Sequence, residues 1–258
     1  MTSIDSGHRG EVSIRDLSKS FAINGRPLAV LKGLNLDIRA GECLVIVGAS
    51  GSGKTTLLRV LAGLEVADGG RVAIDGEPVH GVGSDRAVIF QEPRLLPWLT
   101  VLGNVAFDLE VRGENRARAE ERARDHIGLV GLGDFTDAYP KQLSGGMAQR
   151  VGIASALTVQ PEILLLDEPL GALDAMTKIT MQEELARIWS EENVTMVMVM
   201  VTHDLEEAVY LADRVLVLPK EKGAAARLID IELPRPRDRS EPRFVRYREE
   251  LLREFGLH

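Results

Sequence analysis

A glycine-rich stretch from Gly48 to Thr56 holds the residues with the clearest chemistry in the sequence, Gly-Ala-Ser-Gly-Ser-Gly-Lys-Thr-Thr. It matches the pattern G-x-x-x-x-G-K-[ST], in which glycines let successive backbone N–H groups surround an anion. Lys54 can reach the β- and γ-phosphates of a nucleotide, and the Thr55 hydroxyl can bind Mg²⁺. The predicted phosphate-binding residues are Gly48, Ala49, Ser50, Gly51, Ser52, Gly53, Lys54, Thr55 and Thr56.

Apolar residues on both sides of this loop predict the elements that hold it. Before it, Cys43 to Val47 is a short apolar run that is typical of a buried parallel strand. After it, leucines recur at helical spacing, and a helix there directs its positive end at the anion. An ordinary glycine-rich turn with a solvated lysine is the alternative, and the flanking strand and helix argue against it.

A second apolar run ends in two carboxylates. Ile163 to Leu166 is followed directly by Asp167 and Glu168. A carboxylate at the end of a core strand beside a phosphate loop holds Mg²⁺, usually through water, and Asp167 fits this role. Glu168 is placed to orient or deprotonate an attacking water.

Leu143-Ser144-Gly145-Gly146 precedes the Asp167 strand. With this third motif, the chain resembles the ATP-binding-cassette (ABC) ATPase family from Val12 to about Leu218. The family's signature loop continues with Gln where this chain has Met147. The change leaves the anion-binding part intact, namely the Ser144 hydroxyl, the two glycine amides and the start of a helix. The resemblance implies that Ser144, Gly145 and Gly146 bind ATP.

Three further segments match the family in the same order. Phe90-Gln91-Glu92 resembles the Q-loop, which implies that Gln91 meets Mg²⁺ and the attacking water. Gly171 to Asp174 resembles the D-loop, which crosses the dimer interface. Val201 to Asp204 resembles the switch loop, where His203 contacts the γ-phosphate and steadies Glu168. Phe21 matches the aromatic residue that stacks on adenine, although a core phenylalanine is the alternative. The implied catalytic residues are Lys54, Gln91, Ser144, Glu168 and His203, and the implied metal ligands are Thr55, Gln91 and Asp167.

The stretch from Glu92 to Val101, Glu-Pro-Arg-Leu-Leu-Pro-Trp-Leu-Thr-Val, resembles the nitrate, sulfonate and taurine branch of ABC importers. The residues from Leu170 to Ala175 and the Pro-Arg-rich tail do so too. Within that branch the chain is most similar to the ATP-binding subunits of aliphatic sulfonate importers. Nitrate, taurine and pyrimidine-precursor import stay open, and so does an exporter subunit. Leu95, Leu96 and Trp98 line the groove for the permease's coupling helix or belong to the core of a helical subdomain.

The resemblance also implies partners and a location. The family hydrolyses ATP with Mg²⁺ as a homodimer of cassettes that drives two transmembrane permease subunits. In importers, a periplasmic or lipid-anchored protein delivers the solute, and the cassettes lie on the cytoplasmic face of the cell (inner) membrane. A net charge of −8 argues against nucleic acid as the main partner. The chain also lacks the long coiled coil of DNA-repair ABC ATPases and the second cassette of translation-factor ABC proteins.

These motifs require an α/β fold, a P-loop cassette whose mainly parallel central sheet carries the site. The chain has 258 residues, enough for such a cassette at 11–219 with a tail at 220–258. Alternating patterns predict an antiparallel subdomain, and the absence of strand signals predicts an inserted helical subdomain at about 92–142. The tail is expected to be a solvated segment packed on the domain, with an amphipathic helix from Phe244 to Phe255. The expected antiparallel strands are Glu11–Leu17, Leu34–Ile38 and Arg71–Ile74, and the expected central strands are Cys43–Val47, Ala87–Phe90, Ile163–Leu166, Val194–Val201 and Val215–Leu218.

Overall fold

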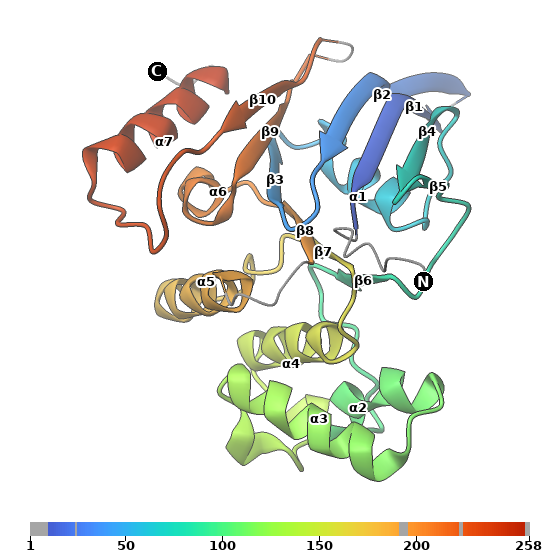
Figure 1. The fold of residues 1–258 in the computed structure, drawn as a ribbon, viewed down its shortest axis with the longest axis vertical. Helices are drawn as coiled ribbons and strands as arrows, with labels where there is room; N and C mark the ends of the chain where they lie inside the picture. Colours follow the sequence, from blue (N-terminus) through green and yellow to red (C-terminus); the bar gives the residue numbers. More distant parts are fainter. Residues whose placement is uncertain (1–9, 24, 191–195, 222–223, 256–258) are drawn as a thin grey trace, which may run out of the picture.

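A six-stranded sheet in the order β10-β9-β3-β8-β7-β6 runs through the middle of the molecule (Figure 1). The computed structural model describes residues 10–23, 25–190, 196–221 and 224–255. The strands from β9 to β6 are parallel, and β10 is antiparallel to β9. Their bounds are β3 Cys43–Gly48, β6 Arg86–Ile89, β7 Ile163–Asp167, β8 Val197–Val201, β9 Arg214–Leu218 and β10 Arg227–Asp230. The five predicted central strands are confirmed, although residues 194 and 195 lie outside the described part of the chain.

Both faces of this sheet are covered, which explains why its strands are apolar throughout. In β3, the side chains of Cys43, Val45 and Val47 belong to one core, and those of Leu44 and Ile46 belong to another. All five residues are buried. Alternate side chains point to opposite faces of a strand, so the continuous apolar run serves two cores.

One core lies between the central sheet, helix α1 (Lys54–Leu61) and a four-stranded antiparallel sheet in the order β2-β1-β4-β5. The strands of that sheet are β1 Val12–Ile23, β2 Arg26–Ile38, β4 Gly69–Ile74 and β5 Glu77–Pro78. The predicted antiparallel sheet is confirmed, but β1 and β2 are longer than predicted because they stay paired up to Ile23 and Arg26. The sequence between them is Asn24-Gly25, the strongest short hairpin signal.

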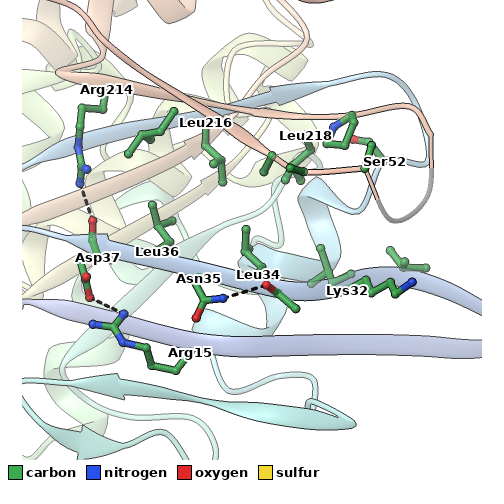
Figure 2. Close-up of a pocket in the computed structure, with 18 of the residues that line it drawn as sticks. Arg15, Lys32, Leu34, Asn35, Leu36, Asp37, Ser52, Arg214, Leu216 and Leu218 are labelled. Carbon is green, nitrogen blue, oxygen red and sulfur yellow. Dashed lines mark hydrogen bonds and ion pairs between the residues drawn. The ribbon is translucent and has the colours of Figure 1, made fainter.

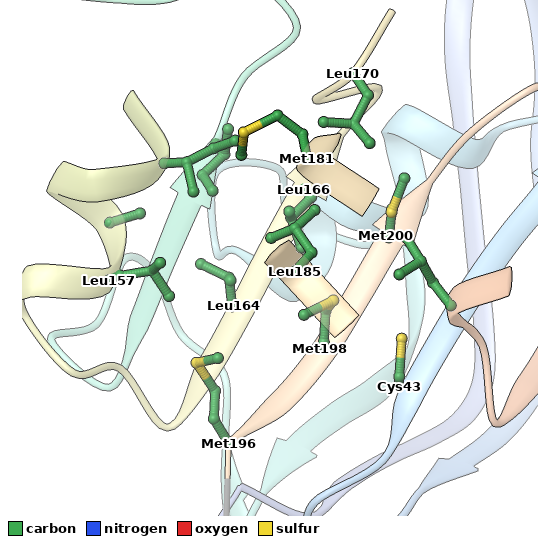
Figure 3. Close-up of a cluster of buried hydrophobic side chains, with 14 of the residues drawn as sticks. Cys43, Leu157, Leu164, Leu166, Leu170, Met181, Leu185, Met196, Met198 and Met200 are labelled. Carbon is green, nitrogen blue, oxygen red and sulfur yellow. The ribbon is translucent and has the colours of Figure 1, made fainter. Parts of the chain in front are cut away.

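The other core packs helices on the opposite face of the central sheet. Figure 3 shows Leu164, Met198 and Met200 of the sheet facing Met181 and Leu185, which belong to α5 (Ala175–Ser190). Methionine is flexible enough to fill irregular gaps where helices cross a twisted sheet. Cys43 belongs to this cluster, as a buried small hydrophobe should, and burial raises the pKa of its thiol to about 12.

Three helices form the end of the molecule farthest from the antiparallel sheet, namely α2 (Val101–Val111), α3 (Arg116–Leu129) and α4 (Gly145–Thr158) (Figure 1). Short 3₁₀ turns at Gly133–Phe135 and Pro140–Gln142 connect α3 to α4. Helix α3 is rich in charged residues and buries only the face made by Ala119, Ala123 and Ile127. The helix N-termini are capped by side chains that accept backbone hydrogen bonds, at Thr100 for α2, Asn115 for α3 and Ser144 for α4.

The tail packs on the domain, as predicted, and it also contains a strand that was not predicted. It adds β10 to the central sheet and ends in α7 (Pro242–Glu254), which packs beside α6 (Leu205–Leu211). The predicted amphipathic helix and the predicted packing of the tail on the domain are confirmed, but the tail is less solvated than expected. Arg237 is buried, and its guanidinium donates hydrogen bonds to several backbone carbonyls, which stand in for the water that a solvated tail would use.

Phe244 is the residue through which α7 is anchored, because its side chain is fully buried in the main core. We expect Phe244→Ala to destabilise the protein by about 3–5 kcal/mol, since it removes a buried ring and leaves a cavity. Urea unfolding of the variant measures this loss. Glu249→Ala on the exposed side of the same helix should stay within about 0.5 kcal/mol of the wild type. Equal stability of both variants would show that α7 does not contribute to the fold.

Candidate functional site

The phosphate-binding loop joins β3 to α1, and its glycines are required by its backbone. Gly51 and Gly53 have φ angles of 78° and 102°, in the left-handed region that favours glycine. A Cβ on Gly53 would lie 2.8 Å from Val30 Cγ1, and one on Gly48 would lie 2.6 Å from Ser52 Oγ. The loop therefore tolerates no side chain at these positions, and its N–H groups stay open to an anion.

Lys54 is buried at the start of α1, and its Nζ donates to the carbonyl oxygens of Gly48, at 2.9 Å, and Ala49, at 3.2 Å. Burial lowers the pKa of Lys54, and the carboxylates of Glu168 and Asp167 act in the opposite direction. A nearby anion would therefore favour the charged ammonium.

The Ser52 hydroxyl is also buried, and it has no hydrogen-bond partner among the described residues. Its side chain lies at one end of a cavity of about 830 Å³ between β2 and β9 (Figure 2). At the other end, Arg15 forms an ion pair with Asp37, whose backbone carbonyl accepts a bond from Arg214. A buried hydroxyl without a partner, next to a buried ammonium and a helix N-terminus, fits a phosphate group.

Thr55 and Asp167 come together at the edge of the sheet. The Thr55 hydroxyl donates to Asp167 Oδ1 at 3.1 Å. Burial raises the pKa of Asp167, and this hydrogen bond partly offsets the effect. Within the described ranges, no group of three or more His, Cys, Asp or Glu side chains could hold a metal. A hydroxyl and one carboxylate fit Mg²⁺, which commonly binds one or two protein oxygens and completes its shell with phosphates and water.

Glu168 is the meeting point of two further loops. Its Oε2 lies 3.1 Å from His203 Nδ1 and 3.5 Å from Gln91 Nε2, which donates to it. Its own φ angle is 46°, an uncommon conformation for a residue other than glycine, and such residues cluster at functional sites. The N–H of Glu168 donates to the Val201 carbonyl at 2.9 Å, which ties the backbone after β7 to the end of β8.

Strand register explains why these residues meet. Ile89 pairs with Leu166, and Asp167 pairs with Val201, so β6, β7 and β8 end side by side. Because the strands are parallel, the residues just after them gather at one edge of the sheet, where ligands bind in open α/β sheets. The structure thus brings together the predicted residues Lys54, Thr55, Gln91, Asp167, Glu168 and His203.

Ser144 is not part of this cluster. It is the N-cap of α4, and its Oγ accepts a bond from the Met147 N–H at 3.2 Å. Because Met147 contributes its backbone here, this bond does not depend on the residue type at that position. Gly146 lies against the D-loop, where a Cβ would come within 3.0 Å of Leu173 Cδ2. Gly145 follows Ser144 at the same helix start, with open space around its Cα.

Phe21 and the D-loop aspartate lie apart from the cluster too. Phe21 is in β1, its side chain is 37% exposed, and the Lys19 ammonium lies 5.2 Å from its ring centroid. An exposed ring with a cation over it is not a core phenylalanine, so that alternative is excluded. Asp174 Oδ1 accepts a bond from the Thr177 N–H at 3.1 Å. Hydrogen bonding from the Thr177 side chain, and then from its backbone N–H, holds the pKa of Asp174 below its usual range.

Two polar contacts around the site were not predicted from the sequence. Gln149, in α4, is buried and donates from Nε2 to the Phe90 carbonyl at 3.1 Å, next to Gln91. Glu207, in α6, is buried and accepts a hydrogen bond from Thr202, next to His203. Both glutamine and glutamate look like ordinary helix residues in sequence. The spacing of Glu207, three residues after the helix cap Asp204, was the available hint of a capping arrangement.

The fold and the site define a P-loop ATPase. The family model described as ABC transporter matches residues 31–171, and the chain belongs to this family. It is 43% identical to the nitrate import ATP-binding protein of Synechocystis sp., over 93% of each chain. It is also 43% identical to the aliphatic sulfonates import ATP-binding protein of Bacillus licheniformis, over 95% of this chain and 94% of the relative.

A solved ATP-binding cassette supports the same assignment, namely a dimeric post-hydrolysis structure bound to ADP and Pi. It is 30% identical, covers 86% of this chain and 100% of its own, and superposes with a TM-score of 0.77. The predicted cassette fold is therefore confirmed, and ATP with Mg²⁺ is the cofactor set of the family. The nitrate relative and the sulfonate relative have the same sequence identity to this chain, 43%. The importer branch is therefore supported, and sulfonate is not singled out as the substrate.

Proposed function

We propose that the chain is the ATP-hydrolysing subunit of an importer for a small oxyanionic solute, with aliphatic sulfonates as the substrate. One observation carries the ATPase part of this proposal. Three strand ends bring Gln91, Asp167, Glu168 and His203 together beside the buried ammonium of Lys54. Positive charge, a hydroxyl–carboxylate pair and a second carboxylate are the groups that phosphoryl transfer to water needs.

In this proposal each side chain has one task. Lys54 and the loop amides bind the phosphates of ATP, and Thr55, Gln91 and Asp167 hold Mg²⁺. When bound, Mg²⁺ neutralises charge on the phosphate oxygens. Glu168 accepts a proton from the attacking water, and His203 fixes the Glu168 carboxylate through Nδ1 while facing the γ-phosphate.

We further propose that two copies of the chain complete each ATP site. Ser144 lies at the exposed start of a 14-residue helix, away from the chain's own cluster. An open helix N-terminus with a hydroxyl and two glycine amides is suited to the γ-phosphate held by a partner copy. The dimeric solved cassette supports this arrangement. Phe21, near the end of β1, is proposed to stack on adenine.

A groove beside Gln91 supports a permease partner. It has a volume of about 420 Å³ and is lined by Leu95, Leu96, Phe107 and neighbouring residues of β6 and α4. Trp98 is not among its lining residues, and its side chain is 69% exposed. We propose that a cytoplasmic helix of each of two permease subunits occupies this groove.

The location follows from that partner. No helix in the described ranges is long and apolar enough to cross a bilayer. The chain is proposed to sit on the cytoplasmic face of the cell (inner) membrane through the permease, which receives solute from a periplasmic or lipid-anchored binding protein. A nucleic-acid partner is not part of the proposal.

We expect deletion of this protein to stop growth on an alkanesulfonate as sole sulfur source, while sulfate still supports growth. The reason is that transport without hydrolysis cannot be driven uphill. Growth curves on each sulfur source, with a plasmid-borne wild-type copy as the control, measure the effect. A parallel culture on nitrate as sole nitrogen source tests nitrate import, the function named for a relative of the same identity. If the deletion strain grows normally on several alkanesulfonates and fails on nitrate, the proposed substrate changes from sulfonate to nitrate. The proposed role in import then stays the same.

A further inference from the structure

The tail holds the helix that follows the His203 loop. Helix α6 begins two residues after His203, and its last carbonyls receive hydrogen bonds from Arg237. Arg237 Nη1 lies 2.7 Å from the Val209 oxygen and 2.6 Å from the Ala212 oxygen. The final carbonyls of a helix have no partners within the helix and attract cations. The tail therefore fixes the far end of α6.

A second tail arginine connects to the near end of α6 through buried side chains. Arg239 Nη2 donates to Gln182 Oε1 at 2.6 Å, and Gln182 Nε2 donates to Glu207 Oε1 at 3.3 Å. The other oxygen of Glu207 accepts the Thr202 hydroxyl. Gln182 and Glu207 are both buried, in α5 and α6. These bonds form an unbroken path from the tail to the residue before His203.

The path ends on both sides of His203. Thr202 Oγ1 accepts the backbone N–H of Asp204 at 3.1 Å, so the same hydroxyl braces the residues before and after the histidine. The His203 side chain is 66% exposed, and it lies 3.1 Å from Glu168. With so little packing around the ring, the backbone at its two neighbours sets where the ring points.

We propose that Arg239 is a positioning residue that sets the His203 loop through Gln182 and Glu207. This inference rests on the role of His203 in the proposed function. The mechanism lies in the Gln182 amide, which has one accepting and one donating end. The guanidinium of Arg239 holds the accepting oxygen, which turns the amino group towards the Glu207 carboxylate. Without Arg239 the amide can rotate, lose its bond to Glu207 and release one restraint on Thr202.

Other charged groups lie near Glu207, and their contacts show that Arg239 does not act on Glu207 directly. Lys178 Nζ lies 2.6 Å from Asp204 Oδ2 and 3.8 Å from Glu207 Oε1, so it supplies the direct positive charge. Arg239 contacts neither the Asp204 nor the Glu207 carboxylate. The guanidinium lies over Tyr210, with its carbon 3.8 Å from the ring centroid, and its Nε lies 3.5 Å from Glu206. Its influence on the loop therefore runs through Gln182.

Arg239→Met tests this, because methionine can keep an apolar contact with Tyr210 but removes the hydrogen-bond donor to Gln182 together with the charge. We expect kcat for ATP hydrolysis to fall about tenfold, by analogy with the lower range for removing an outer hydrogen-bond partner of a metal ligand. The KM for ATP should change less than about twofold. Arg239→Lys, which keeps a donor, should recover most of the rate. Arg248→Met is the matched control, since Arg248 also contacts Glu206, at 3.8 Å, without reaching Gln182.

A double-mutant comparison separates positioning from general stability. In a His203→Ala background, Arg239→Met should lower kcat no further, because the residue it positions is gone. Gln182→Met breaks the path from its other side and should give the same loss, so the test survives poor folding of the tail variant. An additional tenfold loss on top of His203→Ala, or equal loss in Arg248→Met, overturns the proposal. If His203→Ala alone keeps full turnover, the proposed role of His203 fails; if only Arg239→Met and Gln182→Met keep it, this inference alone fails.

Discussion

Glu168→Gln is expected to lower ATP hydrolysis by roughly 10²–10⁴-fold, the usual contribution of a general base. ATP should still bind, because Lys54 and the glycine loop are untouched. The amide has the shape of the carboxylate and can still bond to His203, but it cannot accept a proton from water. Glutamine at this position should tolerate the left-handed backbone conformation, φ 46°, as well as glutamate does.

Steady-state phosphate release measures the loss, and ATP-dependent dimerisation on a sizing column measures binding. ATP that is bound and not hydrolysed should hold two chains together. Glu249→Gln on the exposed face of α7 removes the same charge elsewhere and should keep wild-type turnover. Asp167→Asn should differ from Glu168→Gln by weakening Mg²⁺-dependent binding. Near-normal turnover in Glu168→Gln would remove Glu168 from the role of base.

The residues of the cluster were predictable because each directly follows an apolar run. Asp167 is the last residue of β7, and His203 and Gln91 lie two residues after β8 and β6. Parallel strands deliver such residues to one edge of the sheet. Sequence could therefore indicate which residues gather there. It could not give the contacts between them, such as Nδ1 of His203 on Glu168, because those depend on rotamers and on the register of distant strands. Their catalytic roles stay predictions.

The burial of Arg237 in the tail was not predicted, for a physical reason. Pro-Arg-Pro-Arg beside acidic residues is typical of a solvated segment. Arg237 instead neutralises the end of α6, and its partners are backbone carbonyls, which no sequence pattern displays. Burial, with Arg235 nearby, lowers the pKa of Arg237 to about 10, and a guanidinium is still charged at neutral pH. The Arg239–Gln182–Glu207 path was invisible for a similar reason, since its members are far apart in the chain.

Two inactive variants should restore activity when they are combined in one dimer. In the proposed dimer, Lys54→Ala damages the phosphate-binding half of a site, and Ser144→Arg damages the half that faces it. Each homodimer then has two broken sites. In a mixed dimer, the Ser144→Arg chain supplies an intact Lys54, and the Lys54→Ala chain supplies an intact Ser144. One site is whole, and the opposite site carries both changes.

The expected gain is large enough to measure. Losing one contact of this type costs roughly 10²–10³ in rate. The mixed dimer should reach about half of the wild-type rate per dimer if the two sites act independently. The variants are co-expressed with different tags together with the permease, purified through both tags and assayed for hydrolysis. Thermal unfolding of each parent is the control for folding, because Lys54 also bonds to the carbonyls of Gly48 and Ala49.

A mixed dimer that is as inactive as its parents has two explanations: the sites are not shared, or turnover requires two intact sites. A further dimer distinguishes these explanations. A dimer of one wild-type chain and one chain carrying both Lys54→Ala and Ser144→Arg has two damaged sites if the sites are shared, each with a single change. If each chain forms its own site, that dimer keeps one complete site, whereas the mixed dimer keeps none. High activity in the first dimer and low activity in the mixed dimer would therefore contradict shared sites. Low activity in both dimers would mean that turnover requires two intact sites at once. The result expected here is an active mixed dimer and an inactive dimer of one wild-type chain and one doubly changed chain.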